Sequence, residues 1–479
     1  MRLGVKILLA GLFAVCVYRA ATQSFVHDEA LTFRLYIAGP AEAIFESYDP
    51  NHHFLNTLLM RLSASIFGDS ELALRLPALA GAALYFVSIY RLSLAAFGET
   101  ALFPLAVALM SLNPFTLDFM VAARGYGIAL ALMIFALTML YESLALASTP
   151  RKKLVLAGAA LGLSVTANLV FLLPVLGVAG IAVYLLPRIE PAPAKAAGKH
   201  SKRKRPQRRK AWPLWVWLVT PMAVVGLLYL EAAPIEQMKL ELFYVGAHSI
   251  AESLRNMALV ALEHSGPLRY GRVADLWRDA VAFVVAPGIV VAAFAAGWRK
   301  KDRLLLLVSV PLVFASVALV LMHYVLDRPY PADRTGIYFA PLVCLGLIGL
   351  ARLHKTATKA VYVLSAILLV QFVLAFNTRM FWVWEYDADT RDMSRYIAAH
   401  RNAGANTVRV GGSWELSEAM AYYMVRNNWQ WMAVERRPPE LGYDYYMIVP
   451  HDVGLLSQMG LRLVYRGPVS GSMLAVPAR

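Results

Sequence analysis

Charge and cysteine are both scarce in this sequence. Charged residues make up 16% of its 479 residues and hydrophobic residues 59%, whereas soluble domains have about 25% charged and 45–50% apolar residues. This balance excludes an ordinary soluble domain for most of the chain. The only two cysteines, Cys16 and Cys344, both lie in apolar segments, which excludes a disulfide framework and a cysteine-based metal site. The sequence also shows no internal repeat, and its C-terminal part has no glycine-rich phosphate loop.

The apolar residues gather in segments long enough to cross a membrane. A helix of about 20 residues spans the hydrocarbon core of a bilayer, and the sequence predicts about eleven such spans. They are residues 3–22, 72–92, 101–119, 125–143, 154–168, 169–187, 213–231, 279–297, 304–323, 336–351 and 360–378. The fold class is therefore predicted to be an α-helical, multi-pass membrane protein.

Basic residues mark every second loop between these spans. Arg2 and Lys6 lie at the N-terminal end of the first span, and further lysines and arginines fall near residues 91, 151–153, 202–210, 299–301 and 352–359. Basic loops stay on the cytoplasmic side, which predicts a cytoplasmic N-terminus in a bacterial inner membrane and a periplasmic C-terminal region. The alternative is a cleaved N-terminal signal peptide, which would remove this alternation.

Much of the net charge of +15 lies in these cytoplasmic loops. Residues 195–210 are rich in proline, alanine, lysine and arginine and have no hydrophobic periodicity. We interpret this stretch as a disordered loop that orients the chain and contacts anionic membrane lipids. A nucleic-acid partner is not expected.

Two domains are predicted. Residues 1–378 form the transmembrane domain, with outer loops 23–71, 232–278 and 324–335. In the first loop, residues 30–37 and 51–67 are amphipathic and are expected to lie along the membrane surface. Residues 379–479 have helix patterns near 389–400 and 415–426 and strand patterns near 407–410, 429–434, 443–449, 461–465 and 473–476. This alternation predicts a small periplasmic α/β domain.

Several polar residues stand at the predicted outer boundary of the membrane. Asp28 and Glu29 directly follow the first span, and adjacent carboxylates are costly to place there, which favours the mouth of a membrane-embedded active site. The further candidates are His52, His53, Asp118, Arg124, Tyr126, Arg328 and Arg334. Together they gather carboxylates, imidazoles and guanidinium groups near one boundary of the membrane.

Simpler interpretations of these residues remain open. Arg124, like Arg75, can be an arginine that extends to the interface. The two histidines can cap a surface helix or form hydrogen bonds with it, and Asp118 can be a solvated acidic residue of a loop. Arg328 and Arg334 can pair with the neighbouring Asp327 and Asp333 as a surface cluster.

The order of these residues resembles a known family. His27-Asp28-Glu29 is followed by Asn51-His52-His53-Phe54-Leu55 and by the block from Phe67-Gly68-Asp69-Ser70-Glu71 to Arg75-Leu76-Pro77. Asn113-Pro114, Asp118, Ala123-Arg124-Gly125-Tyr126-Gly127 and Pro331-Ala332-Asp333-Arg334-Thr335 continue the pattern. The pattern is similar to that of the protein O-mannosyltransferase and aminoarabinose-transferase superfamily (glycosyltransferase family 39-like), over roughly residues 1–350.

The resemblance implies a GT-C fold and an inverting glycosyltransferase that uses a polyprenyl-phosphate sugar. By resemblance, Asp28 is the general base that takes the proton of the acceptor hydroxyl, and Glu29 orients the acceptor or Asp28. Arg124, Arg328 and Arg334 are the candidates for binding the donor phosphate. His52, His53, Asp118 and Tyr126 would contact substrate, and the acceptor could be a lipid, a glycan or a protein.

Two departures from the family pattern concern acceptor choice and metal binding. Ala122 stands where many relatives have an acidic residue, and His52-His53-Phe54 replaces the usual His-Pro-Pro or Glu-Lys-Pro. No cofactor or metal is expected, although His52, His53, Glu29 and Asp118 could in principle hold a divalent ion. The rival functions are a polysaccharide polymerase or ligase with a diphosphate-linked donor and a transporter of lipid-linked sugars, although a transporter is expected to show paired half-sequences.

Overall fold

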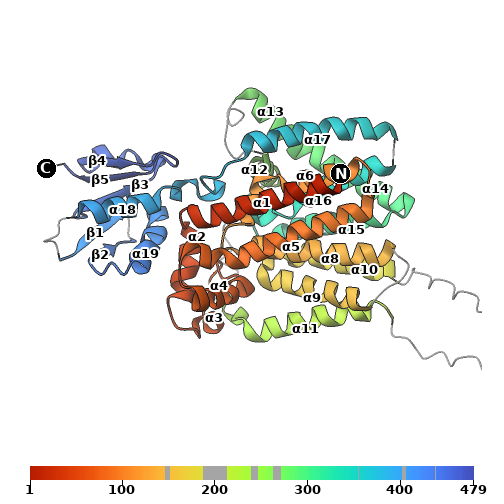
Figure 1. Cartoon of the computed structure of the whole chain (residues 1–479), viewed down its shortest axis with the longest axis horizontal. Helices are drawn as coiled ribbons and strands as arrows, with labels where there is room; N and C mark the ends of the chain where they lie inside the picture. Colours follow the sequence, from red (N-terminus) through yellow and green to blue (C-terminus); the bar gives the residue numbers. More distant parts are fainter. Residues whose placement is uncertain are drawn as a thin grey trace, which may run out of the picture.

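The computed structural model describes residues 1–145, 151–186, 213–238, 246–262, 271–353, 355–401, 406–436 and 439–478. The basic stretch 195–210 lies outside these residues. The described chain forms a bundle of long helices with a small sheet domain at one end (Figure 1). The sheet domain lies at the end of the bundle that carries α2 (His27–Thr32), α3 (Ala43–Glu46) and α4 (Phe54–Phe67), and the N-terminus lies toward the opposite end of α1 (Arg2–Thr22). The residue pair Asp28 and Glu29 is therefore on the side that faces the sheet domain.

Seven helical segments in the described part of the chain are long and apolar enough to cross a membrane. They are α1 (Arg2–Thr22), α5 (Glu71–Phe97), α8 (Gly125–Ala145), the segment 272–300 that ends in α14 (Ala286–Lys300), α15 (Arg303–Leu326), the segment 333–353 that ends in α16 (Phe339–Leu353), and α17 (Lys355–Ala375). Shorter helices fill the remaining predicted spans: α6 (Leu102–Ser111), α9 (Arg151–Ala167), α10 (Leu172–Leu185) and α11 (Val216–Ala232). The chain is a multi-pass membrane protein, and the number of eleven spans stays a prediction.

One predicted span is interrupted. Residues 101–119 form α6 and a separate short helix, α7 (Pro114–Phe119). α6 ends at Ser111, and Asn113 caps the second helix, because its side chain accepts a hydrogen bond from the Thr116 N–H at 3.0 Å. Pro114 at the first position of α7 has no N–H to leave unpaired. With ten residues, α6 is about 15 Å long, half the thickness of a bilayer core.

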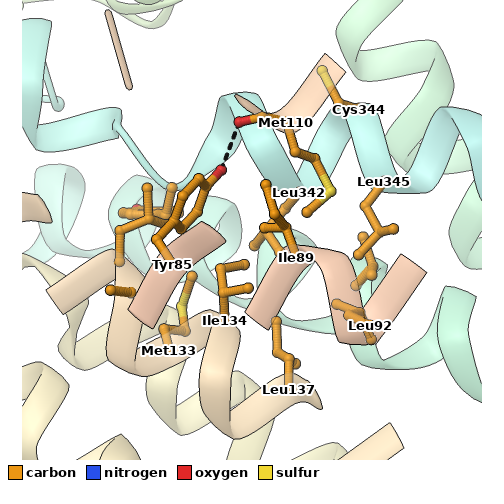
Figure 2. Packing of buried hydrophobic residues seen from close by; sticks show 14 of the residues in the cluster. Tyr85, Ile89, Leu92, Met110, Met133, Ile134, Leu137, Leu342, Cys344 and Leu345 are labelled. Atoms are coloured by element: carbon orange, nitrogen blue, oxygen red, sulfur yellow. Dashed lines mark hydrogen bonds between the residues drawn. The ribbon is translucent and has the colours of Figure 1, made fainter. Parts of the chain in front are cut away.

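The core of the bundle forms where α5 lies between α8, α6 and α16. Figure 2 shows Tyr85, Ile89 and Leu92 of α5 packed among side chains of these helices. The Tyr85 hydroxyl donates a hydrogen bond of 2.8 Å to the Met110 carbonyl, which satisfies its buried polar group. Leu345 of α16 joins the same cluster. The apolar character that made these segments recognisable as spans therefore serves helix–helix packing as well as contact with lipid.

The sheet domain agrees with the helices and strands expected from the sequence. Its helices are α18 (Thr390–His400) and α19 (Ser417–Arg426). Its strands are β1 (Val408–Gly412), β2 (Met432–Val434), β3 (Tyr445–Ile448), β4 (Leu461–Arg466) and β5 (Met473–Pro477), in the sheet order β2-β1-β3-β5-β4. Strands β2, β1 and β3 are parallel, whereas β5 runs antiparallel to β3 and β4. The predicted small α/β domain is confirmed.

The two amphipathic stretches of the first outer loop differ in what covers their apolar sides. The stretch 30–37 continues α2 (His27–Thr32) into a π-helical turn, η1 (Phe33–Ile37). Phe33 packs edge-on against Tyr422 of α19, so protein and not lipid covers this side, and the expected membrane-surface position is wrong here. The second stretch, α4 (Phe54–Phe67), exposes Leu62, Ile66 and Phe67, as expected for contact with lipid.

A close approach between α7 and α8 gives a test of the packing. A Cβ atom on Gly127 would overlap the Phe119 carbonyl, whereas Gly180 on α10 has open space around it. We expect Gly127→Ala to lower the free energy of unfolding by about 1–3 kcal/mol, because overpacking forces the backbone to shift. Thermal unfolding in detergent measures this loss against Gly180→Ala as the control. Equal unfolding temperatures for the two variants would contradict the close packing of these helices.

Candidate active site

Asp28 lies in a buried cluster of charges at the end of the bundle. Its residue is only 7% exposed, and its Oδ2 atom lies 2.9 Å from an Nη atom of Arg334 and 3.8 Å from one of Arg124. The side chain of Trp384 also hydrogen-bonds to this carboxylate. Among the described residues, Oδ2 accepts no well-directed hydrogen bond, so its pairing with Arg334 is one of charge. This oxygen therefore keeps a lone pair for a proton.

The charges around Asp28 keep it ionised. Burial by itself disfavours a charged carboxylate, but the Arg334 and Arg124 guanidinium groups outweigh burial and hold the pKa of Asp28 below its usual value. The carboxylate is thus deprotonated at neutral pH and can accept a proton. Its basicity rises if another anion takes over the two arginines, because each arginine then neutralises less of its charge.

Arg124 is fixed by hydrogen bonds from its guanidinium group to the chain around Asp28. It donates to the Asp28 carbonyl at 3.3 Å, to the Thr32 hydroxyl at 3.0 Å and to the Asn51 side-chain oxygen at 2.7 Å. The arginine is only 1% exposed, so it does not extend to the interface, which excludes the simpler interpretation. It ties α2 to the loop that carries His52 and His53.

The two histidines and Tyr126 lie beside the arginines. His53 packs edge-on against Tyr126 with 5.0 Å between ring centroids, and the Tyr126 side chain hydrogen-bonds to Arg334. His52 stacks on Tyr36 at 4.2 Å, and burial lowers the pKa of His52 to about 4. Burial, with the charges of Arg124 and Arg334, also holds the pKa of His53 well below its usual value. Both rings are neutral, and their buried Nε2 atoms have no hydrogen-bond partner in the described chain.

Of the two roles predicted for Glu29, its contacts favour orienting Asp28 over orienting the acceptor. Its fully buried carboxylate binds the Arg75 guanidinium at 2.6 and 2.9 Å and accepts the Ala123 N–H at 2.6 Å. Arg75 is fully buried too, and donates to the carbonyls of Gln23 and Ser24 at 2.9 and 2.7 Å. The expectation that Arg75 extends to the interface is therefore wrong. Glu29 holds the segment that carries Asp28 and leaves no oxygen for an acceptor.

Two other predicted residues lie apart from the Asp28 cluster. The Asp118 carboxylate binds Arg19 of α1 at 2.5 Å and accepts the Trp382 N–H at 2.9 Å. It joins buried segments and is not a solvated or substrate-facing acid. The Arg328 Nε donates to the Leu326 carbonyl at 2.8 Å in an exposed position, whereas Arg334 reaches Asp28. Of the arginines in this outer loop, the structure brings only Arg334 to the carboxylate.

The possible divalent-ion site does not assemble from the residues named for it. Glu29 is bound to Arg75 and Asp118 to Arg19, so neither carboxylate is free to join the histidines. In the described ranges, the group with metal-ligand spacing is Glu415, His451 and Asp452 of the sheet domain, whose ligand atoms lie within 4.8 Å of one another. It contains none of the predicted site residues.

Sequence reasoning missed the segment that closes the site from the sheet-domain side. Trp384 is 2% exposed, hydrogen-bonds to Asp28 and lies under the Arg334 guanidinium, 5.4 Å from the ring centroid. Asp387, also buried, accepts the His27 N–H at 2.7 Å. The available signal was the run of aromatic and acidic residues 382–387 directly after the last span. Nothing local indicates that this run touches residue 28.

The comparison with solved structures agrees with the fold predicted from the sequence. No protein-family model matches the sequence, and no curated protein matches it. The structure is similar to that of ArnT from Cupriavidus metallidurans bound to undecaprenyl phosphate, with a TM-score of 0.50, 14% identity and 98% of each chain covered. The apo structure of the same protein gives the same TM-score and identity and covers 98% of this chain and 97% of ArnT. The predicted GT-C fold is confirmed.

The Glu29–Arg75 pair gives a test of the assignment of Glu29 to structure. Glu29→Gln leaves a buried guanidinium without its charge partner, which costs about 3–5 kcal/mol. We expect a large loss of folded protein, measured as the monodisperse fraction in detergent and as the unfolding temperature. The control is Glu99→Gln, because the Arg2–Glu99 pair is more than half exposed and such pairs contribute about 0–1 kcal/mol. Normal stability of Glu29→Gln would show that the pair does not hold the segment.

Proposed function

We propose that this protein is an inverting glycosyltransferase that moves a sugar from a polyprenyl phosphate to a hydroxyl group at the outer face of the inner membrane. The observation that carries the proposal is the buried, ionised Asp28 carboxylate between Arg334 and Arg124. The carboxylate can accept a proton, and the two arginines beside it can bind a phosphate. The two tasks of glycosyl transfer can therefore be carried out at the same site. The likeness in fold to a protein that binds undecaprenyl phosphate supports the donor class.

In the proposed reaction, the acceptor hydroxyl attacks the anomeric carbon of the sugar. The bond from that carbon to the phosphate oxygen breaks, its electron pair stays on the phosphate, and the hydroxyl proton passes to Asp28. The products are the glycosylated acceptor and polyprenyl phosphate, and Asp28 then releases the proton to water. Because the hydroxyl attacks from the side opposite the phosphate, the configuration at the anomeric carbon inverts.

Arg334 and Arg124 are proposed to bind the phosphate. Arginine forms bidentate, charge-assisted hydrogen bonds with phosphate, and these strengthen as negative charge develops on the leaving group. The phosphate would compete with Asp28 for the same two guanidinium groups, so donor binding itself makes Asp28 a stronger base. The neutral His52 and His53 rings and Tyr126 are proposed as hydrogen-bonding partners of the sugar or the acceptor.

The rival functions make different demands on the site. A polymerase or ligase with a diphosphate-linked donor would use the same base and the same arginines. The identity of the labelled product distinguishes it from a glycosyltransferase that uses a monophosphate-linked donor. A transporter of lipid-linked sugars would need no base. Membranes given a panel of radiolabelled polyprenyl-phosphate sugars should transfer label to a lipid, glycan or protein fraction. Label that crosses the membrane on an unchanged lipid would favour the transporter.

The general-base role of Asp28 is tested by Asp28→Asn. This change keeps the size of the side chain and removes its proton affinity, so transfer should fall by about 10²–10⁴-fold, the usual contribution of general-base catalysis. Transfer is measured with the labelled donor found in the panel, and folding by size-exclusion chromatography. Full activity in a folded Asp28→Asn protein would refute the assignment.

The phosphate-binding role is tested with two arginines of the same outer loop. Arg334→Ala should weaken binding of undecaprenyl phosphate by about 10- to 100-fold, because a hydrogen bond to a charged group contributes about 1.5–3 kcal/mol. It should also raise the pKa of Asp28 and move the acidic limb of the kcat/KM profile to higher pH, since the charge that lowers this pKa is lost.

Arg328→Ala is the matched control for this pair, because the Arg328 guanidinium lies in an exposed position. Its binding of undecaprenyl phosphate and its pH profile should match those of the wild type. If Arg334→Ala and Arg328→Ala bind the lipid equally well, Arg334 does not contact the phosphate.

A further inference from the structure

The segment that carries Asp28 is held by side chains that follow it by more than 350 residues. The Phe25 N–H donates to the Tyr423 hydroxyl at 2.8 Å, and the His27 N–H donates to the Asp387 carboxyl at 2.7 Å. Asp387 directly precedes the sheet domain's first helix, α18, and Tyr423 lies in α19. Both side chains are buried. The backbone on either side of Val26 is thus anchored to the sheet domain.

The hydrogen bond from the His27 N–H falls where α2 has no partner of its own, and the bond from the Phe25 N–H lies two residues before the helix. The first N–H groups of a helix lack an acceptor within the helix, and α2 begins at His27 after Val26, whose side chain offers no capping oxygen. Asp387 acts as an external cap for the residue that immediately precedes Asp28. The rotation of α2, and with it the direction of the Asp28 carboxylate, therefore depends on a group outside the bundle.

Further contacts fix the two anchoring side chains themselves. The Tyr423 hydroxyl donates to Glu71 of α5 at 3.3 Å, and Glu71 also pairs with Arg426 and Arg391 of the sheet domain. Asp387 accepts the Thr390 hydroxyl at 3.2 Å. Both anchors are held on two sides, so their positions are set by the docking of the sheet domain on α5.

We propose that the sheet domain is a positioning element for the general base: Asp387 and Tyr423 fix the start of α2 so that Asp28 faces Arg334. This inference rests on the proposed function for its catalytic consequence, but not for its structural one. Loss of either anchor should let the start of α2 move, which lowers the rate of transfer. Donor phosphate binding should fall less than the rate, because Arg334 belongs to another segment and Arg124 keeps its hydrogen bond to the Asn51 side chain. Asp387 and Tyr423 are positioning residues and do not touch the reacting atoms.

The charge of Asp387 is not required for this role. Burial, with the nearby charges of Asp28 and Glu29, holds the pKa of Asp387 well above its usual value, so a neutral carboxyl group caps α2. Asparagine has the same shape and the same acceptor oxygen. Asp387→Asn should therefore keep the anchor, whereas Asp387→Ala should lose it.

The experiment is hydrogen–deuterium exchange of the full-length protein in detergent, read on peptides that contain residues 23–32. Tyr423→Phe and Asp387→Ala should speed exchange of these amides about fivefold, since a single hydrogen bond contributes about 1 kcal/mol. Asp387→Asn should restore protection relative to Asp387→Ala. The control is Tyr446→Phe, which removes a buried hydroxyl bonded to Gly442, Tyr443 and Glu440 within the same domain, and its peptides 23–32 should exchange as in the wild type.

A transfer assay then links the anchor to catalysis. With the active labelled donor, Tyr423→Phe and Asp387→Ala should lower kcat about 10- to 100-fold, as expected when a reacting group is displaced by about 1 Å, with a smaller loss of undecaprenyl phosphate binding. Unchanged exchange in both variants would overturn the proposal, as would faster exchange without loss of kcat. If exchange responds as expected but Asp28→Asn is fully active, the anchor stands and the proposed function fails.

Discussion

The buried pair of Glu29 and Arg75 is the interaction on which the rest of the site depends. It joins the start of α2 to α5, and the same arginine holds the carbonyls of the preceding turn. Two opposite charges without solvent are stable only when their hydrogen bonds are all made, and here both groups are surrounded by partners. The neighbouring Asp28 is consequently held at the end of a rigid turn, where its carboxylate meets arginines from two other segments.

Adjacent carboxylates have opposite roles because their surroundings differ. Glu29 faces inward and its oxygens are bound by Arg75, Ala123 and Val26. Asp28, one residue earlier on α2, points about 100° away and keeps an oxygen without a well-directed hydrogen bond. One carboxylate can therefore be structural while the other is chemically available, although the sequence presents them as an equivalent pair.

The site is assembled from parts of the chain that are far apart in the sequence. Asp28 comes from the first outer loop, Arg124 from the turn before α8, Arg334 from the turn before α16 and Trp384 from the approach to the sheet domain. Each part is anchored by contacts that do not involve the reacting groups. An enclosed, preorganised charge cluster of this kind stabilises charge without reorganisation during the reaction.

The sequence by itself determined the helical membrane class and the small α/β domain and singled out Asp28, Arg124 and Arg334, because hydropathy, strand alternation and charge at a membrane boundary are local properties. Local pattern did not separate Arg334 from Arg328, and only the family resemblance gave Asp28 and Glu29 different roles, because nearby residues of one type differ only in the direction of their side chains. Tertiary structure alone decided that Arg75 and Asp118 are buried in ion pairs and that Trp384 and Asp387 border the site. The cited partners of Arg75, Asp118 and Asp387 lie between 46 and 360 residues away along the chain, and no local pattern encodes contacts that form only when helices and domains pack.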